Sequence, residues 1–391
     1  MSRVALSVRK KAHLGPYPVQ YLAPGIFPIT LISLLRVAHQ APQASVWELL
    51  GLLRLTRPFK SSDPRDKVYA LIGLVLDPQG IDLKADYNIS TEDLYVSVAI
   101  ESLDKRKDLT LLANAGMPST PGDLKLPSWV PDWTNNNEGR AIIAATLAAD
   151  AVNRSATKNS QPKLSISAGS KVLTIRGVQI DTIAKLETSL LFGEGVFQLD
   201  NDAVRREARW NLRCKACLDS YVAFAEHACS FPEGQAREES LWRTLCCDLT
   251  AEIPITRAPA EYVIGYKILQ MANEATREDG QVDTLSLHLR ASSLFPGQWD
   301  HFTMFMGTLG GYCRGRNLCV TDGGYLGSVP TGSLVGDKIC LLFGSRVPFL
   351  LRECNEGYFK LVGECYIHGM MDGEGMMDPN IDALSRDFEI I

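Results

Sequence analysis

The residues best suited to chemistry lie near the end of the chain, where a histidine precedes two carboxylates. His368 is followed by Asp372 and Glu374, and glycines occupy positions 369, 373 and 375. An imidazole beside carboxylates can perform general acid–base catalysis, and glycines let the backbone approach a ligand closely. The alternative is that the glycines serve turns and that His368 forms local hydrogen bonds. This alternative is favoured, because no neighbouring residue implies a nucleophile or an oxyanion site.

A second group of residues has the side-chain types of a zinc site. Cys214 and Cys217 form a Cys-x-x-Cys pair, and His227 and Cys229 follow. A structural zinc site needs four such ligands, commonly from two closely spaced pairs. Here the surrounding sequence is helical and free of proline, and no second Cys-x-x-Cys pair follows. We therefore expect buried helical thiols, and neither a metal nor a cofactor.

A charged cluster and two tryptophans are the candidate ligand-binding residues. Arg65 and Asp66 follow Asp63 and could form a charged site, although helix capping and an ion pair explain them as well. Trp129 and Trp133 could stack on a ligand, although large aromatic side chains more often anchor a core. For both pairs the structural role is the favoured reading.

The charged cluster must be positioned by a short helix that we expect from Asp63 onward. Asp63 is a good N-cap, and Pro64 suits the first helical position because its missing N–H would be unpaired there. Gly73 weakens the helix near its end and Pro78 stops it. Apolar side chains recur between these limits at helical spacing, at Val68, Tyr69, Leu71, Ile72 and Val75.

The two tryptophans must be positioned by a stiff extended segment. Pro127 and Pro131 each restrict their own φ and the conformation of the residue before them. Elsewhere the first two thirds of the chain show helical periodicity or a helix cap such as Ser90. The helices expected in this way cover residues 29–37, 45–55, a stretch after Ser90, 202–230, 237–249, 260–274 and 297–308.

The last part of the chain has the pattern of short strands. From Tyr312 onward, apolar stretches of about five residues are separated by glycine-containing turns, which is typical of a small antiparallel barrel or sandwich. We therefore predict an α+β fold with helical N-terminal and middle parts and a C-terminal β-barrel or sandwich-like module. The expected divisions are 1–140 mainly helical, 141–163 a polar connection, 164–310 a strand followed by a variable helical region, 311–376 β-rich and 377–391 a tail.

Composition limits the classes of function. The chain is 46% apolar and 22% charged, as in ordinary globular proteins. Forty Lys and Arg against 45 Asp and Glu give a net charge of −5, without the basic excess typical of nucleic-acid binding. No apolar run is long enough to span a membrane, and the N-terminus lacks a signal-peptide core. We expect a cytoplasmic protein with free cysteines, without a nucleic-acid partner or a membrane span.

Several stretches, in order along the chain, resemble fungal heterokaryon incompatibility proteins. The sequence DPRDKVYALIGL at residues 63–74 is similar to a signature just downstream of their HET domain, and LPSWVPDW at residues 126–133 is similar to a second landmark. Further similar stretches are LWRTL at residues 241–245 with Asp248, and the sequence of residues 322–374. The chain is thereby identified as a member of this family.

The resemblance leaves out the HET domain itself. The chain has no Ser-Tyr-x-Trp-Gly stretch and no Trp-Ile-Asp followed by Cys-Ile-x-Gln, so it is similar to the region after that domain, standing alone or truncated. The resemblance implies a part in allorecognition and programmed cell death, through sensing of a protein partner or a small-molecule ligand. The alternative is a standalone small-molecule enzyme, of the kind found in secondary metabolism, with a pocket near His368, Asp372 and Glu374.

Overall fold

The computed structural model describes most of the chain after residue 47. The described residues are 48–75, 83–106, 108–117, 124–135, 152, 154–167, 169, 171–188, 191, 203–250, 255–354 and 357–391. The helix expected at residues 29–37, the first part of the one expected at 45–55 and Pro78 lie outside this set.

The N-terminal helices α3, α4 and α5 cover Leu49–Thr56, Asp66–Ile72 and Thr91–Arg106, and a 3-10 helix covers Thr110–Asn114. Helix α5 begins at the predicted cap, since the Asp93 N–H donates to Ser90 Oγ at 3.0 Å. The α4 helix begins at Asp66, two residues later than predicted. Asp63 still caps the preceding turn, because its carboxylate accepts from the Arg65 N–H at 2.9 Å.

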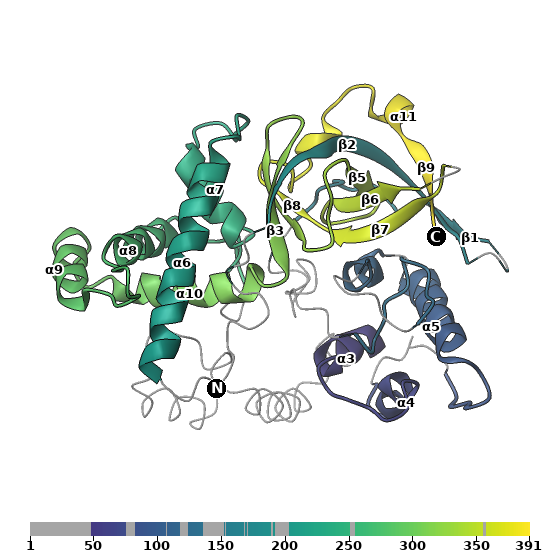
Figure 1. Ribbon diagram of the computed structural model, residues 1–391. Helices are drawn as coiled ribbons and strands as arrows, with labels where there is room; N and C mark the ends of the chain where they lie inside the picture. The colour runs from purple at the N-terminus through teal and green to yellow at the C-terminus, as the bar shows by residue number, and fades with distance from the viewer. Residues whose placement is uncertain are drawn as a thin grey trace.

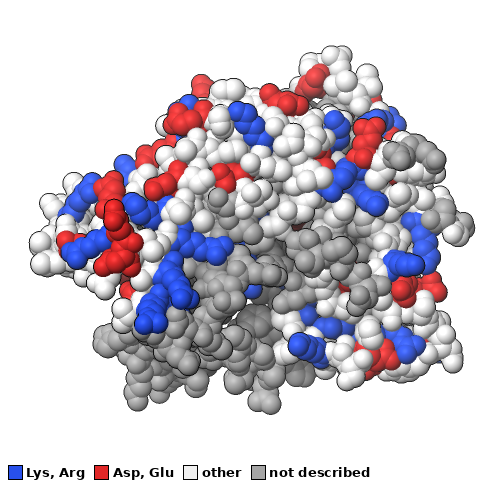
Figure 2. All heavy atoms as spheres, viewed as in Figure 1, with Lys and Arg blue, Asp and Glu red and all other residues white. Residues whose placement is uncertain are grey.

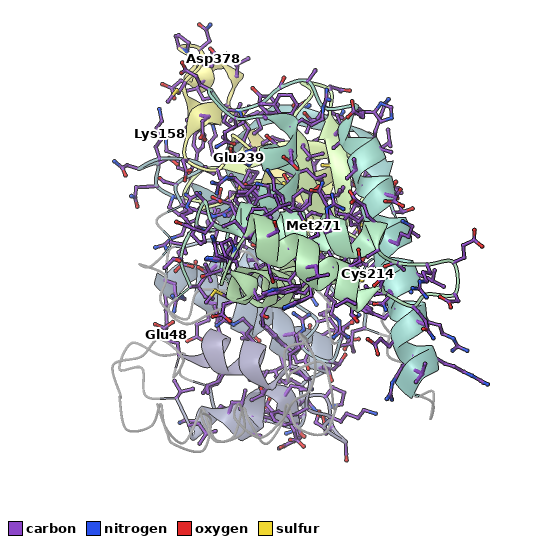
Figure 3. All side chains as sticks on the ribbon, turned by 90° about the vertical axis from the view of Figure 1, so that its left-hand side faces the viewer. Glu48, Lys158, Cys214, Glu239, Met271 and Asp378 are labelled. Carbon is purple, nitrogen blue, oxygen red and sulfur yellow. The ribbon has the colours of Figure 1, made fainter. Side chains whose placement is uncertain are left out.

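The middle helices α6 to α10 lie to the left of the barrel in Figure 1. They cover Ala203–Ala225, Arg237–Leu245, Tyr262–Glu274, Thr284–Leu294 and Trp299–Tyr312. Four of them were predicted, and α9 was not. Their own core includes Phe305, whose ring lies 5.9 Å from Tyr262 and 6.0 Å from Tyr266. Figure 3 views the molecule from this side, with Cys214 on α6 and Met271 on α8 labelled.

The β module closes on itself through one long strand. Strand β2, Leu173–Glu187, pairs in turn with β9 near its start, β5 at its middle and β3 at its end. The sheet order β5-β6-β7-β9-β2 is closed by the β2–β5 pairing, which makes the barrel seen in Figure 1. The other strands are β1 Leu164–Ile166, β3 Arg316–Thr321, β4 Leu326–Pro330, β5 Lys338–Leu342, β6 Phe349–Glu353, β7 Phe359–Glu364, β8 Tyr366–Ile367 and β9 Arg386–Ile390.

The predicted α+β class is confirmed, but the β module takes strands from outside residues 311–376. Strand β2 comes from the preceding region, and β9 comes from the expected tail at 377–391. The tail is ordered because Phe388 and Ile390 alternate along β9 and are fully buried. Residues expected in a polar connection also contact the barrel, where the Thr157 hydroxyl donates to the Ser345 carbonyl at 2.7 Å.

The N-terminal helices and the barrel share one apolar core. That cluster joins Leu52, Tyr95 and Trp129 to Phe359 and Phe388 of the barrel. None of the helices in the described part of the chain has both the length and the apolarity needed to cross a bilayer. On the described part of the face in Figure 2, acidic and basic side chains are interspersed.

Candidate functional site

His368 lies just after β8 and is 6% exposed. Its Nδ1 is 2.7 Å from Tyr366 Oη, and its Nε2 is 2.6 Å from Gln235 Oε1. With the amide oxygen as acceptor, Nε2 carries the proton and Nδ1 accepts from the tyrosine hydroxyl. Desolvation by burial lowers the pKa of His368 to about 4, so the imidazole is neutral.

The two predicted carboxylates lie together but make other contacts. Glu374 Oε2 accepts from the Asp372 N–H at 2.7 Å, and the Asp372 carboxylate accepts from Arg257. The hydrogen bonds of His368 go instead to Tyr366 and Gln235. The structure thus brings Asp372 and Glu374 to each other and leaves the imidazole with neutral partners.

Arg65 and Asp66 join α4 to the loop before α5. The Arg65 guanidinium pairs with Asp63 at 2.7 Å, donates to the carbonyls of Tyr87 and Ile89, and lies 5.2 Å above the Tyr87 ring. Asp66 Oδ1 accepts from the Tyr87 hydroxyl at 2.6 Å. Through these contacts both candidate residues hold α4 against the loop before α5.

Trp129 and Trp133 are buried, with 0% and 1% of their surfaces exposed. Trp129 Nε1 donates to the Lys171 carbonyl at 2.9 Å, just before β2. The segment predicted to be extended instead makes a turn here, where the Val130 N–H donates to the Pro127 carbonyl at 2.9 Å. The Arg57 guanidinium lies 5.6 Å from the Trp133 ring centroid. Protein atoms therefore cover both rings, and the stiff segment presents them to the core.

The cysteine-rich stretch lies mainly on α6. All ten cysteines are free, as predicted, and burial raises the pKa of the Cys214 and Cys217 thiols. His227 Nδ1 is 3.0 Å from Lys185 Nζ, and Cys229 is exposed. Within the described residues no three His, Cys, Asp or Glu side chains are arranged to hold a metal ion.

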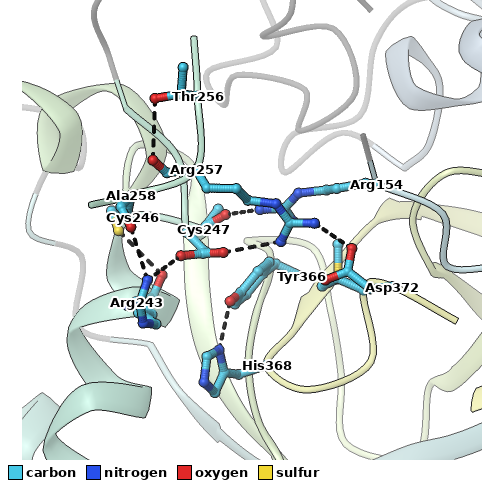
Figure 4. A network of polar contacts seen from close by, with 12 residues as sticks. Arg154, Arg243, Cys246, Cys247, Thr256, Arg257, Ala258, Tyr366, His368 and Asp372 are labelled. Atoms are coloured by element: carbon cyan, nitrogen blue, oxygen red, sulfur yellow. Dashed lines mark hydrogen bonds and ion pairs between the residues drawn. The ribbon is translucent and has the colours of Figure 1, made fainter. Parts of the chain in front are cut away.

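A polar network at the junction of the middle helices and the barrel was not predicted (Figure 4). Asp248, just after α7, accepts from Arg243 at 2.6 Å and from Arg257 at 3.1 Å. Arg257 also donates to Asp372 of the barrel. One carboxylate therefore links helix α7 to the barrel through a shared guanidinium. We call this network, with Arg154, Cys247, Tyr366 and His368, the Asp248 junction.

The backbone of the junction is held in an uncommon conformation. Cys247 and Asp248 are consecutive non-glycine residues in the left-handed region, with φ of 49° and 52°. Such residues cost about 1 to 3 kcal/mol each and tend to gather at functional sites. Here the cost is offset by hydrogen bonds from the Asp248 N–H to the Arg243 carbonyl at 2.7 Å and from the Ala258 N–H to the Asp248 carbonyl at 3.1 Å.

Arg154 completes the junction from the barrel side. Its side chain lies 5.0 Å above the Tyr366 ring, and its Nη2 donates to the Cys247 carbonyl. Tyr366 in turn donates to His368, so the contacts run from Arg154 to Gln235. The sequence indicated Asp248, which ends a stretch similar to the incompatibility proteins, and it indicated His368 and Asp372 as candidates for a different arrangement. The spacing of Arg154, Asp248, Arg257 and Asp372 carries no signal, because they converge only in the fold.

These contacts define a class of domain: a closed barrel with helices inserted in the chain between strands β2 and β3 and attached to it in part by charged side chains. The chain belongs to the Het-6 beta-barrel domain family, whose model matches residues 170–380, more than half of the chain. The heterokaryon incompatibility family predicted from the sequence is thereby confirmed.

A named relative extends the similarity beyond the barrel. Over 348 residues the chain is 24% identical to Heterokaryon incompatibility protein 6, OR allele, of Neurospora crassa. The aligned stretch covers 80% of this chain and 49% of that protein. The chain therefore spans about half the length of the curated relative that it matches. No solved structure matches the chain.

Proposed function

We propose that the chain is the sensing region of a heterokaryon incompatibility-type protein, lying after the HET domain in the sequence of such proteins. It responds to a protein partner or a ligand and so contributes to fungal allorecognition and programmed cell death. The observation that carries this proposal is the similarity over 348 residues to a Neurospora crassa protein named for incompatibility. The proposal includes a cytoplasmic location, which the free cysteines support.

The Asp248 junction supports the sensing role. It links the middle helices to the barrel through side chains that reach the surface, since the side chains of Arg257 and Asp372 are 36% and 47% exposed. A molecule that competes for either group changes the partners of Asp248. Because packed interfaces switch between discrete arrangements, such a local change can alter how the helices sit on the barrel.

The enzyme alternative has less support from the geometry. Both ring nitrogens of His368 are engaged, and its hydrogen bonds go to Tyr366 and Gln235. Asp372 is held by Arg257, and Glu374 by a backbone N–H. A general base needs a free nitrogen within reach of a substrate proton. We therefore propose a sensing role and no reaction.

A domain exchange in the Neurospora crassa protein tests this proposal. The matched region of that protein is replaced by this chain, and the growth of heterokaryons with compatible and incompatible strains is measured. We expect the chimera to cause growth arrest, and to lose that effect when Arg257→Ala and Asp372→Ala are combined. The matched control is Arg176→Ala with Asp387→Ala, which removes an exposed ion pair elsewhere on the barrel. Normal growth with a folded, abundant chimera contradicts the proposal.

A further inference from the structure

Arg154 is a buried cation without a counter-ion among the described residues. Its side chain is 95% buried, since the residue is 5% exposed. Its Nη2 donates to the Cys247 carbonyl, while Nε and Nη1 are buried and have no hydrogen-bond partner in the described part of the chain.

Two other arginines with low exposure have hydrogen-bond or ion-pair partners. Arg316, 6% exposed, donates to Ser328 Oγ at 3.0 Å and to the carbonyls of Ser328 and Glu364 at 2.8 and 3.1 Å. Arg352 pairs with the buried Asp337 carboxylate at 2.8 Å. Arg154 is thus as buried as Arg316 and more buried than Arg352, whose side chain is 22% exposed, and it differs from both in its partners.

An unpaired guanidinium in this position is costly for the fold alone. Burying a charge is strongly unfavourable unless an opposite charge and hydrogen bonds offset the lost hydration. The Tyr366 ring, 5.0 Å away, supplies a cation–π contact but no hydrogen bond to Nε or Nη1. A buried methionine would fill the same space at less cost. The donors that remain suit a carboxylate or a phosphate oxygen, which accept guanidinium N–H groups in short, strong hydrogen bonds.

A second guanidinium, that of Arg257, binds the residue next to the one that Arg154 binds. Arg154 binds the carbonyl of Cys247, and Arg257 binds the side chain of Asp248. The nearby carboxylates are already shared, because Asp248 accepts from Arg243 and Arg257, and Asp372 accepts from Arg257. Solvent reaches the junction at the Arg257–Asp372 pair, because these side chains are partly exposed.

We propose that Arg154 and Arg257 bind one oxyanion of a small molecule, either a phosphate or a carboxylate, at the Asp248 junction. The oxyanion accepts from the unfilled donors of Arg154 and competes with Asp372 for Arg257. The bound state thus has a counter-ion for the buried cation. Oxyanion binding here does not depend on the incompatibility role, and either proposal can fail without the other.

Thermal unfolding of the full 391-residue chain tests the site. The probes are inorganic phosphate and succinate, titrated separately, with sodium chloride at equal ionic strength as the reference. We expect a saturable rise in Tm with one probe, about 4 °C at 100 times its Kd. A rise with phosphate alone assigns a phosphate ligand, and a rise with succinate alone assigns a carboxylate.

Two matched variants separate binding at Arg154 from binding elsewhere. Arg154→Met should fold with unchanged or higher Tm and lose the saturable rise, whereas Arg352→Met should lower the Tm and keep the rise. Equal behaviour of the three salts in the native protein overturns the proposal, as does a saturable rise that persists in Arg154→Met. Failure of Arg154→Met to fold without anion also counts against it, because the proposal makes this guanidinium dispensable for the fold.

Discussion

At the scale of single residues, His368 ties stability to pH. Burial lowers its pKa from 6.5 to about 4, so the folded state favours the neutral ring. The stabilisation from this group is complete above pH 6.5 and is lost as the pH falls towards 4. We expect this group to remove about 3 kcal/mol of unfolding free energy between pH 7 and pH 4.

Urea unfolding at pH 7, 5.5 and 4 measures this effect. His368→Gln cannot titrate, so its stability should fall less over this range than that of the native protein. His288→Gln is the control, because His288 is exposed. If all three proteins lose the same free energy, His368 is not the source of the acid sensitivity.

We expect Asp248 to contribute more to the free energy of unfolding than a typical residue just after a helix. Its side chain is 13% exposed and accepts from two guanidinium groups. Asp248→Asn leaves both cations short of their carboxylate, and breaking such a pair costs about 3 kcal/mol. Calorimetry should show a clear fall in Tm.

Asp387→Asn is the matched control for Asp248. That carboxylate is 59% exposed and 3.4 Å from Arg176, and exposed pairs contribute at most about 1 kcal/mol. Equal decreases in Tm for Asp248→Asn and Asp387→Asn would contradict this prediction.

At the scale of elements, Gly265 sets the distance between α8 and α10. A Cβ at this position would lie 2.5 Å from the His301 carbonyl oxygen and 2.6 Å from Phe305 Cβ. Gly265→Ala should therefore separate the helices and lower the unfolding free energy by about 2 kcal/mol in urea titrations.

Gly73→Ala, just after α4, is the control for that substitution. It has no atom within 4 Å of the added Cβ and a φ of −70°, so it should be neutral or slightly stabilising. A neutral result at both glycines would mean that the two helices can move apart without cost.

Elements with local signals could be predicted, and those that depend on distant partners could not. Helix α5 was visible because Ser90 and Asp93 form its cap within four residues. Helix α9 was missed because its leucines alternate along the sequence and its buried stripe is short: Leu287 and Ala291 pack inward, whereas Leu285 and Leu289 are exposed. Strand β9 was missed because only two buried side chains mark it and its partner β2 lies far earlier in the chain.

The candidate site shows the same limit. Residue types suggested His368, Asp372 and Glu374 from their closeness in the sequence, yet the fold gives the histidine different hydrogen-bond partners. The junction instead depends on the left-handed conformation of Cys247 and Asp248, which side-chain patterns do not reveal. Spacing along a chain indicates proximity only within one element or turn.

At the scale of the whole molecule, the helices are attached to the barrel in two different ways. The N-terminal helices share an apolar core with it, so their attachment is largely hydrophobic. The middle helices share a core with Leu318, Val320 and Leu326 of β3 and β4, and in addition they meet the barrel through the charged groups of the Asp248 junction. The second attachment is therefore the one that an ionic ligand or partner can alter.

The pairing of β2 also governs when the barrel can form during translation. This strand leaves the ribosome early, but β3, β5 and β9 follow only after the middle helices, and β9 ends at residue 390. At common synthesis rates the gap of about 200 residues between β2 and β9 lasts about 10 to 40 s, during which the edge of β2 that pairs with β9 has no partner. Such non-local pairing makes barrel closure slow. We therefore expect folding of the nascent chain to be helped by chaperones that shield strand edges until β9 emerges.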